Sequence, residues 1–281
     1  MLRAVWCSQW RLWKAVEKML KEFLGIGGYM REAEGFMSWQ HLTFVSALML
    51  CMTAMAVLAA RRTRGKDMRA HNRVLMIAAL VMDSVELIKI TLMCTLGGDP
   101  MAWLNALPLY LCSIQFITLP VAAFARGRVK EAAIDFVCMF GLLGAVLGTY
   151  CAGNNYACYP VISLDNVVSG ITHSAAGFAA LYIMMTGIAG MKKRNMWIAY
   201  VIMLVFCVAA YGVNLVLGTN YMFLMRGDGT PYDILYNLVS GSRVLYPLGV
   251  MALFAVYIAL AYGAAAYVRR HRTCYVHVTE C

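Results

Sequence analysis

A short polar stretch inside an apolar segment is the first place in this sequence where chemistry is possible. Residues 107–115, with the sequence LPLYLCSIQ, set a thiol, a hydroxyl and an amide among lipid-soluble side chains. Polar groups in hydrocarbon have no water to bind, so they usually face the interior of a helical bundle and find partners there. A lone cysteine more often packs as a small hydrophobe. Cys112 is therefore a candidate nucleophile only if a base and orienting groups reach the same depth.

Candidate partners for Cys112 lie in other apolar segments. His173 is expected at about the same depth as Cys112, roughly 12 to 14 Å below the outer surface at the helical rise per residue. Glu86 and Lys89 bracket that depth, and they share one helix face with Asp83 at i, i+3, i+6 spacing. Cys112, His173 and Glu86 would supply a nucleophile, its base and an orienting group.

Two interpretations of these polar groups remain open. They form either a reaction site or a buried polar network that fixes the packing of the helices. Glu86 either orients His173 or neutralises Lys89, and the spacing favours the ion pair. If Cys112 attacks a carbonyl, the developing oxyanion needs a donor, for which the candidates are Lys89, Gln115 and Asn214.

The composition identifies the class of protein that holds these groups. The chain has 281 residues, of which 62% are hydrophobic and 14% charged, and its mean hydropathy is +0.68. These values indicate an integral membrane protein rather than a soluble domain. The net charge is +10, but the basic residues lie in short runs between apolar segments, so we expect no nucleic-acid partner. The ten cysteines lack the paired spacing of a zinc site, and we expect no metal and no cofactor.

The hydropathy pattern predicts an all-α fold, a seven-transmembrane-helix bundle over residues 41–268 with an N-terminal amphipathic interfacial helix. The spanning segments are expected near 41–60, 74–96, 103–125, 132–150, 166–190, 196–217 and 244–267, with no mid-membrane break in the third or the fifth. Residues 1–40 are predicted to form the interfacial arm, because apolar and basic residues fall on opposite sides of a helix that ends near Gly25, Gly27 and Gly28. The apolar side carries Trp6, Trp10, Trp13, Leu20 and Leu24, and the basic side Arg11, Lys14, Lys18 and Lys21.

Basic loops orient this bundle. The loops at 61–73, 126–130 and 192–194 and the tail at 269–281 are rich in Lys and Arg, whereas the opposite loops hold only Arg226 and Arg243. The positive-inside rule places the basic side in the cytoplasm. We therefore expect a multi-pass protein with a cytoplasmic C-terminal tail. A bacterial cytoplasmic membrane is the expected location.

Three further features lead to structural predictions. Cys151 and Cys158 on the outer side form either a disulfide or two free thiols. Gly144 and Gly148 are a small-xxx-small pair that indicates close helix packing, with no chemistry attached to it. Among the five histidines, only His173 is expected to be buried, while His41 and His71 are expected at the membrane edges.

Four motifs in this order resemble the YwaF and transmembrane protein 164 family. They are Glu86, residues 107–112 (LPLYLC), His173-Ser174, and Asn214 followed by residues 218–224 (GTNYMFL), which include Asn220 and Tyr221. The resemblance covers about residues 40 to 268. In the eukaryotic pattern the cysteine directly follows the proline, a position held here by Leu109, and Cys112 comes one turn later on the same helix face.

The resemblance implies a polytopic acyltransferase that moves fatty acyl chains onto lysophospholipids. Cys112 would hold the acyl group as a thioester, and His173 would act as base and then as acid. The supporting residues would be Glu86, Lys89, Gln115, Asn214, Asn220 and Tyr221. Phospholipid, lysophospholipid and membrane lipids are the partners that this function implies.

Three alternatives to the transferase stay open. A lipid hydrolase would use the same site with water as the acceptor. A proton-coupled or ion-coupled transporter would use Asp83, Glu86, Lys89 and His173 as a polar path through the bundle. A receptor or structural bundle without chemistry is a role that the fold alone can also host.

Overall fold

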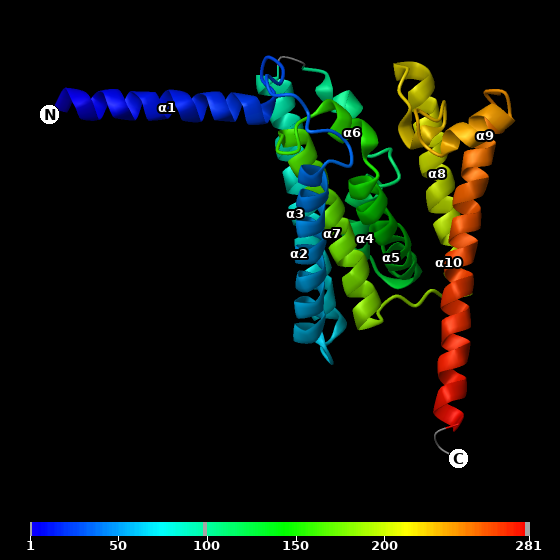
Figure 1. The fold of residues 1–281 in the computed structure, drawn as a ribbon. Coiled ribbons are helices and arrows are strands. Elements are labelled where there is room, and N and C mark those ends of the chain that lie inside the picture. The colour runs from blue at the N-terminus through cyan, green and yellow to red at the C-terminus, as the bar shows by residue number, and fades with distance from the viewer. Residues whose placement is uncertain (1, 98–99, 279–281) are drawn as a thin grey trace.

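The computed structural model describes residues 2–97 and 100–278, and every regular element in these ranges is a helix (Figure 1). The side chains of residues 2–12, of Asn105 and of residues 271–278 are not described. The expectations for Trp6, Trp10 and Arg11 therefore lie outside the described residues. The elements in chain order are α1 (Leu2–Leu24), α2 (Trp39–Thr63), α3 (Met68–Leu96), η1 (Ala102–Asn105), α4 (Gln115–Phe124), α5 (Gly127–Tyr150), α6 (Gly153–Cys158), α7 (Leu164–Thr186), α8 (Lys193–Leu217), η2 (Tyr221–Phe223), α9 (Tyr232–Leu238) and α10 (Leu245–Val278).

Five helical stretches in the described part of the chain are long and apolar enough to cross a membrane. They are Trp39–Thr63, Gly127–Cys158, Leu164–Thr186, Lys193–Leu217 and Leu245–Arg270. Helix α3 has 29 residues, which is also long enough for a crossing, but it carries Asp83, Glu86 and Lys89 in its second half. Five of the seven predicted segments therefore meet the apolar criterion.

The prediction of an unbroken third segment at 103–125 is wrong. This part of the chain consists of the short helix η1, an irregular stretch at 106–114 and the ten-residue helix α4. Pro108 explains the break, because it has no backbone N–H and keeps the preceding residue out of the helical conformation. The Leu109 N–H instead donates to the Leu107 carbonyl at 2.7 Å. The break places the candidate nucleophile Cys112 in a turn and not on a helix.

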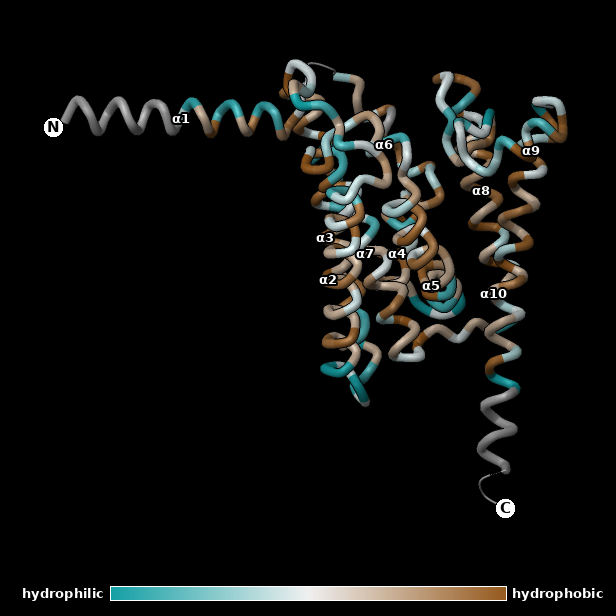
Figure 2. The backbone as a smooth tube through the Cα atoms, viewed as in Figure 1, coloured by the Kyte–Doolittle hydropathy of each residue, from teal (hydrophilic) through white to brown (hydrophobic). Residues whose placement is uncertain are grey.

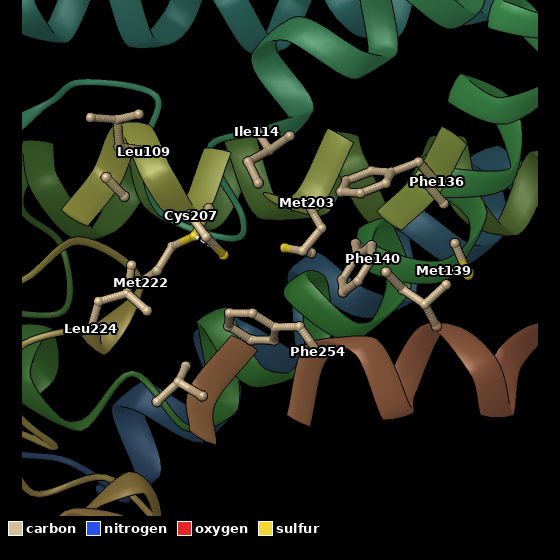
Figure 3. Close-up of a cluster of buried hydrophobic side chains, with 14 of the residues drawn as sticks. Leu109, Ile114, Phe136, Met139, Phe140, Met203, Cys207, Met222, Leu224 and Phe254 are labelled. Carbon is tan, nitrogen blue, oxygen red and sulfur yellow. Dashed lines mark hydrogen bonds between the residues drawn. The ribbon is translucent and has the colours of Figure 1, made fainter. Parts of the chain in front are cut away.

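Helix α7 is the centre of the packing. It contacts α2, α3 and α5, and α4 lies between α3 and α5. Helix α8 packs against α5 on one side and α10 on the other. Figure 3 shows the core that joins α5, α8 and α10, and it includes Leu109 and Ile114 from the irregular stretch. The side chains of Leu109 and Ile114 are only 9% and 0% exposed. The turn that carries Cys112 is therefore anchored in the core on both sides.

The two ends of the bundle differ in character. The α2–α3 turn, the end of α7 and the C-terminal part of α10 lie at one end, and α1, α6 and α9 lie at the other (Figure 1). Hydrophilic residues gather at the α2–α3 turn and where α10 leaves the bundle (Figure 2). Helix α1 extends sideways from the opposite end and away from the bundle (Figure 1). It ends at Leu24, as predicted, where Gly25, Gly27 and Gly28 adopt positive φ angles.

A buried carboxylate joins the two halves of the bundle. Asp135 on α5 is fully buried. It accepts hydrogen bonds from the Met191 backbone N–H at 2.9 Å, from Asn195 Nδ2 at 3.3 Å and from the Tyr262 hydroxyl at 3.1 Å. Since these donors lie before α8, on α8 and on α10, one side chain ties α5 to the α8–α10 pair.

Replacing Asp135 is expected to destabilise the fold. Asp135→Ala leaves buried donors without an acceptor and should lower the free energy of unfolding by about 3 kcal/mol. Asp135→Asn keeps one carbonyl oxygen and should lose less. Denaturant unfolding in detergent micelles measures both values, and equal stabilities for the two variants would contradict the assigned role.

Candidate functional site

Cys112 lies in the turn that leads into α4. The Ile114 N–H donates to the Tyr110 carbonyl at 3.1 Å, and the Gln115 N–H donates to the Cys112 carbonyl at 3.2 Å. The N-terminal end of a helix carries positive partial charge, which favours a nearby thiolate. The side chain is half-buried. The expectation that Leu109 and Cys112 share one helix face is wrong, because this stretch is not helical and Leu109 points into the α5–α8–α10 core.

The structure brings the Cys112 thiol and the His173 imidazole together. The two side chains lie close enough to interact directly with each other. His173 Nδ1 lies 2.7 Å from the Ser169 carbonyl oxygen and 3.3 Å from Ser169 Oγ on the same helix, α7. Since a carbonyl oxygen only accepts, Nδ1 carries the proton and Nε2 is left to accept. The tautomer that this contact selects is the one that can take a proton from a thiol.

Two glycines of α5 form the surface on which this pair rests. A Cβ at Gly148 would lie 2.1 Å from both Nε2 and Cδ2 of His173, so the imidazole is packed directly on the helix backbone. A Cβ at Gly144 would lie 3.7 Å from the Cβ of Cys112. Gly144 and Gly148 are four residues apart and therefore share one helix face. The small-xxx-small pattern at Gly144 and Gly148 is the sequence signal for this role, although by itself the pattern predicts only close helix packing.

Glu86 pairs with Lys89. The Glu86 carboxylate lies 2.7 Å from Lys89 Nζ, and the two side chains are 13% and 15% exposed. This is the ion pair that the spacing favours. The Ser169 carbonyl, and not Glu86, orients the His173 imidazole. The Glu86 charge still acts on His173. Asp83, one turn earlier on α3, has a buried carboxylate oxygen with no hydrogen-bond partner.

The three candidate oxyanion donors differ in what they already bind. Lys89 is held in its ion pair. Asn214 donates from Nδ2 to the Tyr221 carbonyl at 3.0 Å and accepts the Tyr221 N–H at 2.7 Å. Gln115 is fully buried, its Oε1 accepts from the Thr118 hydroxyl at 3.0 Å, and its Nε2 has no partner. Gln115 is therefore the candidate whose amide donor is unused.

Asn220 and Tyr221 brace the broken segment from outside the site. The Tyr221 hydroxyl donates to the Leu104 carbonyl at 2.5 Å, and its ring lies 4.8 Å from that of Tyr110 between centroids. Asn220 closes its own loop by accepting the Met225 N–H at 2.9 Å and donating to the Arg226 carbonyl at 2.8 Å. The motif at 214–224 thus supports the segment that carries Cys112.

The expectation that only His173 is buried is wrong. His41 is 0% exposed, and its Nε2 lies 3.1 Å from the Thr149 carbonyl. His71 is 8% exposed, and its Nδ1 lies 2.6 Å from the Tyr182 hydroxyl. Both fill polar positions between helices, whereas His173 is half-buried. His41 and His71 therefore connect neighbouring helices through these hydrogen bonds and have a structural role.

Cys151 and Cys158 are both free and exposed, so the possible disulfide between them is not formed. The helix α6 separates the two residues. Six helical residues rise about 9 Å, and a disulfide requires Cα atoms within about 7 Å. In the part of the chain that the structure describes, no group of three or more His, Cys, Asp or Glu side chains is arranged to hold a metal ion.

Comparison with known proteins gives one result. A family model described as the TMEM164 family matches residues 36–271, which include every residue of the site above. No significant match was found among curated proteins or among solved structures.

Proposed function

Because this chain belongs to the TMEM164 family of membrane proteins, we propose that it is a membrane-embedded acyltransferase. It moves fatty acyl chains between phospholipids and lysophospholipids through a thioester on Cys112. The observation that carries the proposal is the contact of the Cys112 thiol with the His173 imidazole inside a lipid-soluble bundle. A thiol beside a neutral, oriented imidazole is the arrangement that makes a cysteine nucleophilic.

The first half-reaction forms the thioester. Nε2 of His173 takes the Cys112 proton, and Sγ attacks the ester carbonyl of a phospholipid. The tetrahedral oxyanion accepts a hydrogen bond from Gln115 Nε2, the buried donor that has no other partner. The C–O bond then breaks, and the departing lysophospholipid alkoxide takes the proton back from His173.

The second half-reaction restores the thiol. The hydroxyl of another lysophospholipid gives its proton to His173 Nε2 and attacks the thioester carbonyl. The C–S bond breaks, the Cys112 sulfur regains the proton, and a new phospholipid leaves. The two half-reactions together exchange one oxygen ester for another, so the cycle consumes no further reactant. The Ser169 carbonyl keeps the proton on Nδ1 of His173 throughout the cycle, so Nε2 alone exchanges protons.

We propose seven crossings, with the site near the middle of the bilayer. Helix α3, and η1 together with α4, are the two crossings beside the five apolar ones, and the basic loops lie in the cytoplasm. The ten residues of α4 rise about 15 Å from the site to the basic end, about half the hydrocarbon thickness. An ester carbonyl reaches that depth without its acyl chain leaving the hydrocarbon. Helix α1 would lie in the interface plane on the opposite side.

Acyl exchange tests the proposal directly. Purified protein is incubated with phospholipid and an isotopically labelled lysophospholipid, and mass spectrometry follows labelled phospholipid. An acyl group on the Cys112 peptide that hydroxylamine removes would identify the thioester. Labelled product is expected. Free fatty acid without labelled phospholipid would indicate the hydrolase, and neither product would end the proposal.

The contact of Ser169 with His173 gives a prediction of a small effect. Ser169→Ala should keep acyl exchange within about threefold of wild type, because the shorter contact to Nδ1 comes from the backbone carbonyl and survives the substitution. Initial rates of labelled product measure this. A loss of tenfold or more would show that the hydroxyl, and not the carbonyl, orients the imidazole.

The broken segment at 106–114 favours a second candidate, a proton-coupled or ion-coupled transporter. Transporters commonly build midplane sites from discontinuous helices, and Asp83 has an unpaired buried oxygen. Proton-coupled uptake in liposomes separates the two functions. Transport that Glu86→Gln abolishes and Cys112→Ala leaves intact would favour the transporter.

A further inference from the structure

A cavity of about 320 Å³ lies at the basic end of the bundle, between the start of α3 and the end of α4. Its polar wall is formed by Arg69, Asn72, Arg73 and Arg126, and its apolar wall includes Met76 and Phe124. The residues that line it include no acidic side chain. The proposed acyl-transfer chemistry does not use this cavity, which lies about 15 Å from Cys112 at the other end of α4.

The positive charge of the cavity is not compensated by the protein. No ion pair of the described residues involves Arg69, Arg73 or Arg126. Asp67, two residues before Arg69, caps α3 with its carboxylate, which accepts the Ala70 N–H at 3.2 Å. The start of α3 adds the positive end of a helix dipole.

The carbonyl end of α4 does not offset this charge either. Lys130 Nζ donates to the Ala122 carbonyl at 2.8 Å and to Asn72 Oδ1 at 2.7 Å. An additional cation therefore covers the negative end of α4. Three guanidinium groups around one cavity match the oxygen atoms of a phosphate, which each fork can bind with two parallel hydrogen bonds.

An apolar face continues from the cavity along α3. Ile77 and Leu80 are 57% and 56% exposed, and they follow Arg69 and Arg73 on the same side of the helix. Phe124 at the end of α4 is 66% exposed. A free phosphate ion would make no use of these side chains, whereas the acyl chains of a lipid would cover them.

We propose that this cavity binds the phosphate group of an anionic phospholipid in the cytoplasmic leaflet, with the acyl chains along the exposed face of α3. The site binds this lipid without transforming it, because no nucleophile or base lines the cavity. It differs in place and in chemistry from the site of Cys112 and His173.

Lipid retention tests the proposal. The full chain is reconstituted in vesicles of phosphatidylcholine with phosphatidylglycerol and extracted in mild detergent, and native mass spectrometry counts the bound phosphatidylglycerol. The triple variant Arg69→Gln, Arg73→Gln, Arg126→Gln should retain at least about tenfold less, since it removes the three guanidinium groups that line the cavity and would bind one phosphate together. The control variant Arg61→Gln, Arg64→Gln, Lys193→Gln removes equal charge on the same side and should stay within about twofold.

Three results would overturn the proposal. Equal losses in the two triple variants would show general charge attraction rather than a site. A wild type that binds inorganic phosphate but retains no phosphatidylglycerol would show an anion site without a lipid. Full retention by the single variant Arg73→Gln, which replaces an exposed side chain, would also contradict it. Retention is independent of acyl exchange, so the two proposals fail separately.

Discussion

Cys112→Ala is expected to reduce acyl exchange by at least about a thousandfold, because removal of a catalytic nucleophile abolishes the covalent route altogether. The thiol contacts His173 at the start of α4, and Cys112 is the thiol among the described residues that interacts with this imidazole. Initial rates of labelled phospholipid formation measure the loss. The substitution removes one sulfur atom from a half-buried turn that Leu109 and Ile114 anchor, so the fold should survive.

Cys94→Ala is the matched control for this experiment. Cys94 on α3 is half-buried, as Cys112 is, and both are free thiols. Exchange by Cys94→Ala should equal that of wild type, and the hydroxylamine-sensitive acyl group should remain on the Cys112 peptide. A Cys112→Ala variant with wild-type exchange would remove the thioester from the mechanism.

Gly148→Ala is expected to lower acyl exchange by about a hundredfold while Cys112 and His173 are both still present. The added methyl group would lie 2.1 Å from two ring atoms of His173, so the imidazole must move away from the helix. A displacement of about 1 Å in a catalytic group typically costs about a hundredfold in rate. The rate of Cys112 alkylation by N-ethylmaleimide gives a second readout, because it depends on the same proton transfer and needs no lipid substrate.

Gly144→Ala separates displacement of the base from a general effect of larger side chains on α5. Its methyl group would lie 3.7 Å from the Cys112 Cβ, an ordinary contact distance. Exchange and alkylation should both stay within about threefold of wild type. Equal losses in Gly144→Ala and Gly148→Ala would mean that helix packing, and not the position of the imidazole, controls the site.

Much of the architecture follows from local properties of the sequence. Hydropathy and the alternation of basic loops predict a helical membrane protein, and five of the predicted segments correspond to apolar helices of spanning length. The end of α1 at the glycines and the Glu86–Lys89 ion pair were also predictable from the sequence. Each of these features depends only on residues within one or two helical turns of each other.

The arrangement of the site is decided by tertiary structure. Residues with the right chemistry, Cys112 and His173, were identifiable because polar groups stand out in apolar segments. Their contact depends on how α5 and α7 are rotated against each other and on the flat surface at Gly144 and Gly148. The burial of His41 and His71 depends on helix packing in the same way.

The sequence by itself therefore determined the class of protein, most of the membrane-crossing elements and the residue types that can react. Only the tertiary structure decided that the segment after Pro108 is broken, that a backbone carbonyl of Ser169 orients His173, and that Gln115 keeps an unused donor. The physical reason is that hydropathy and charge add along the chain, residue by residue. Helix rotation and side-chain contact result instead from many weak interactions between residues far apart in sequence.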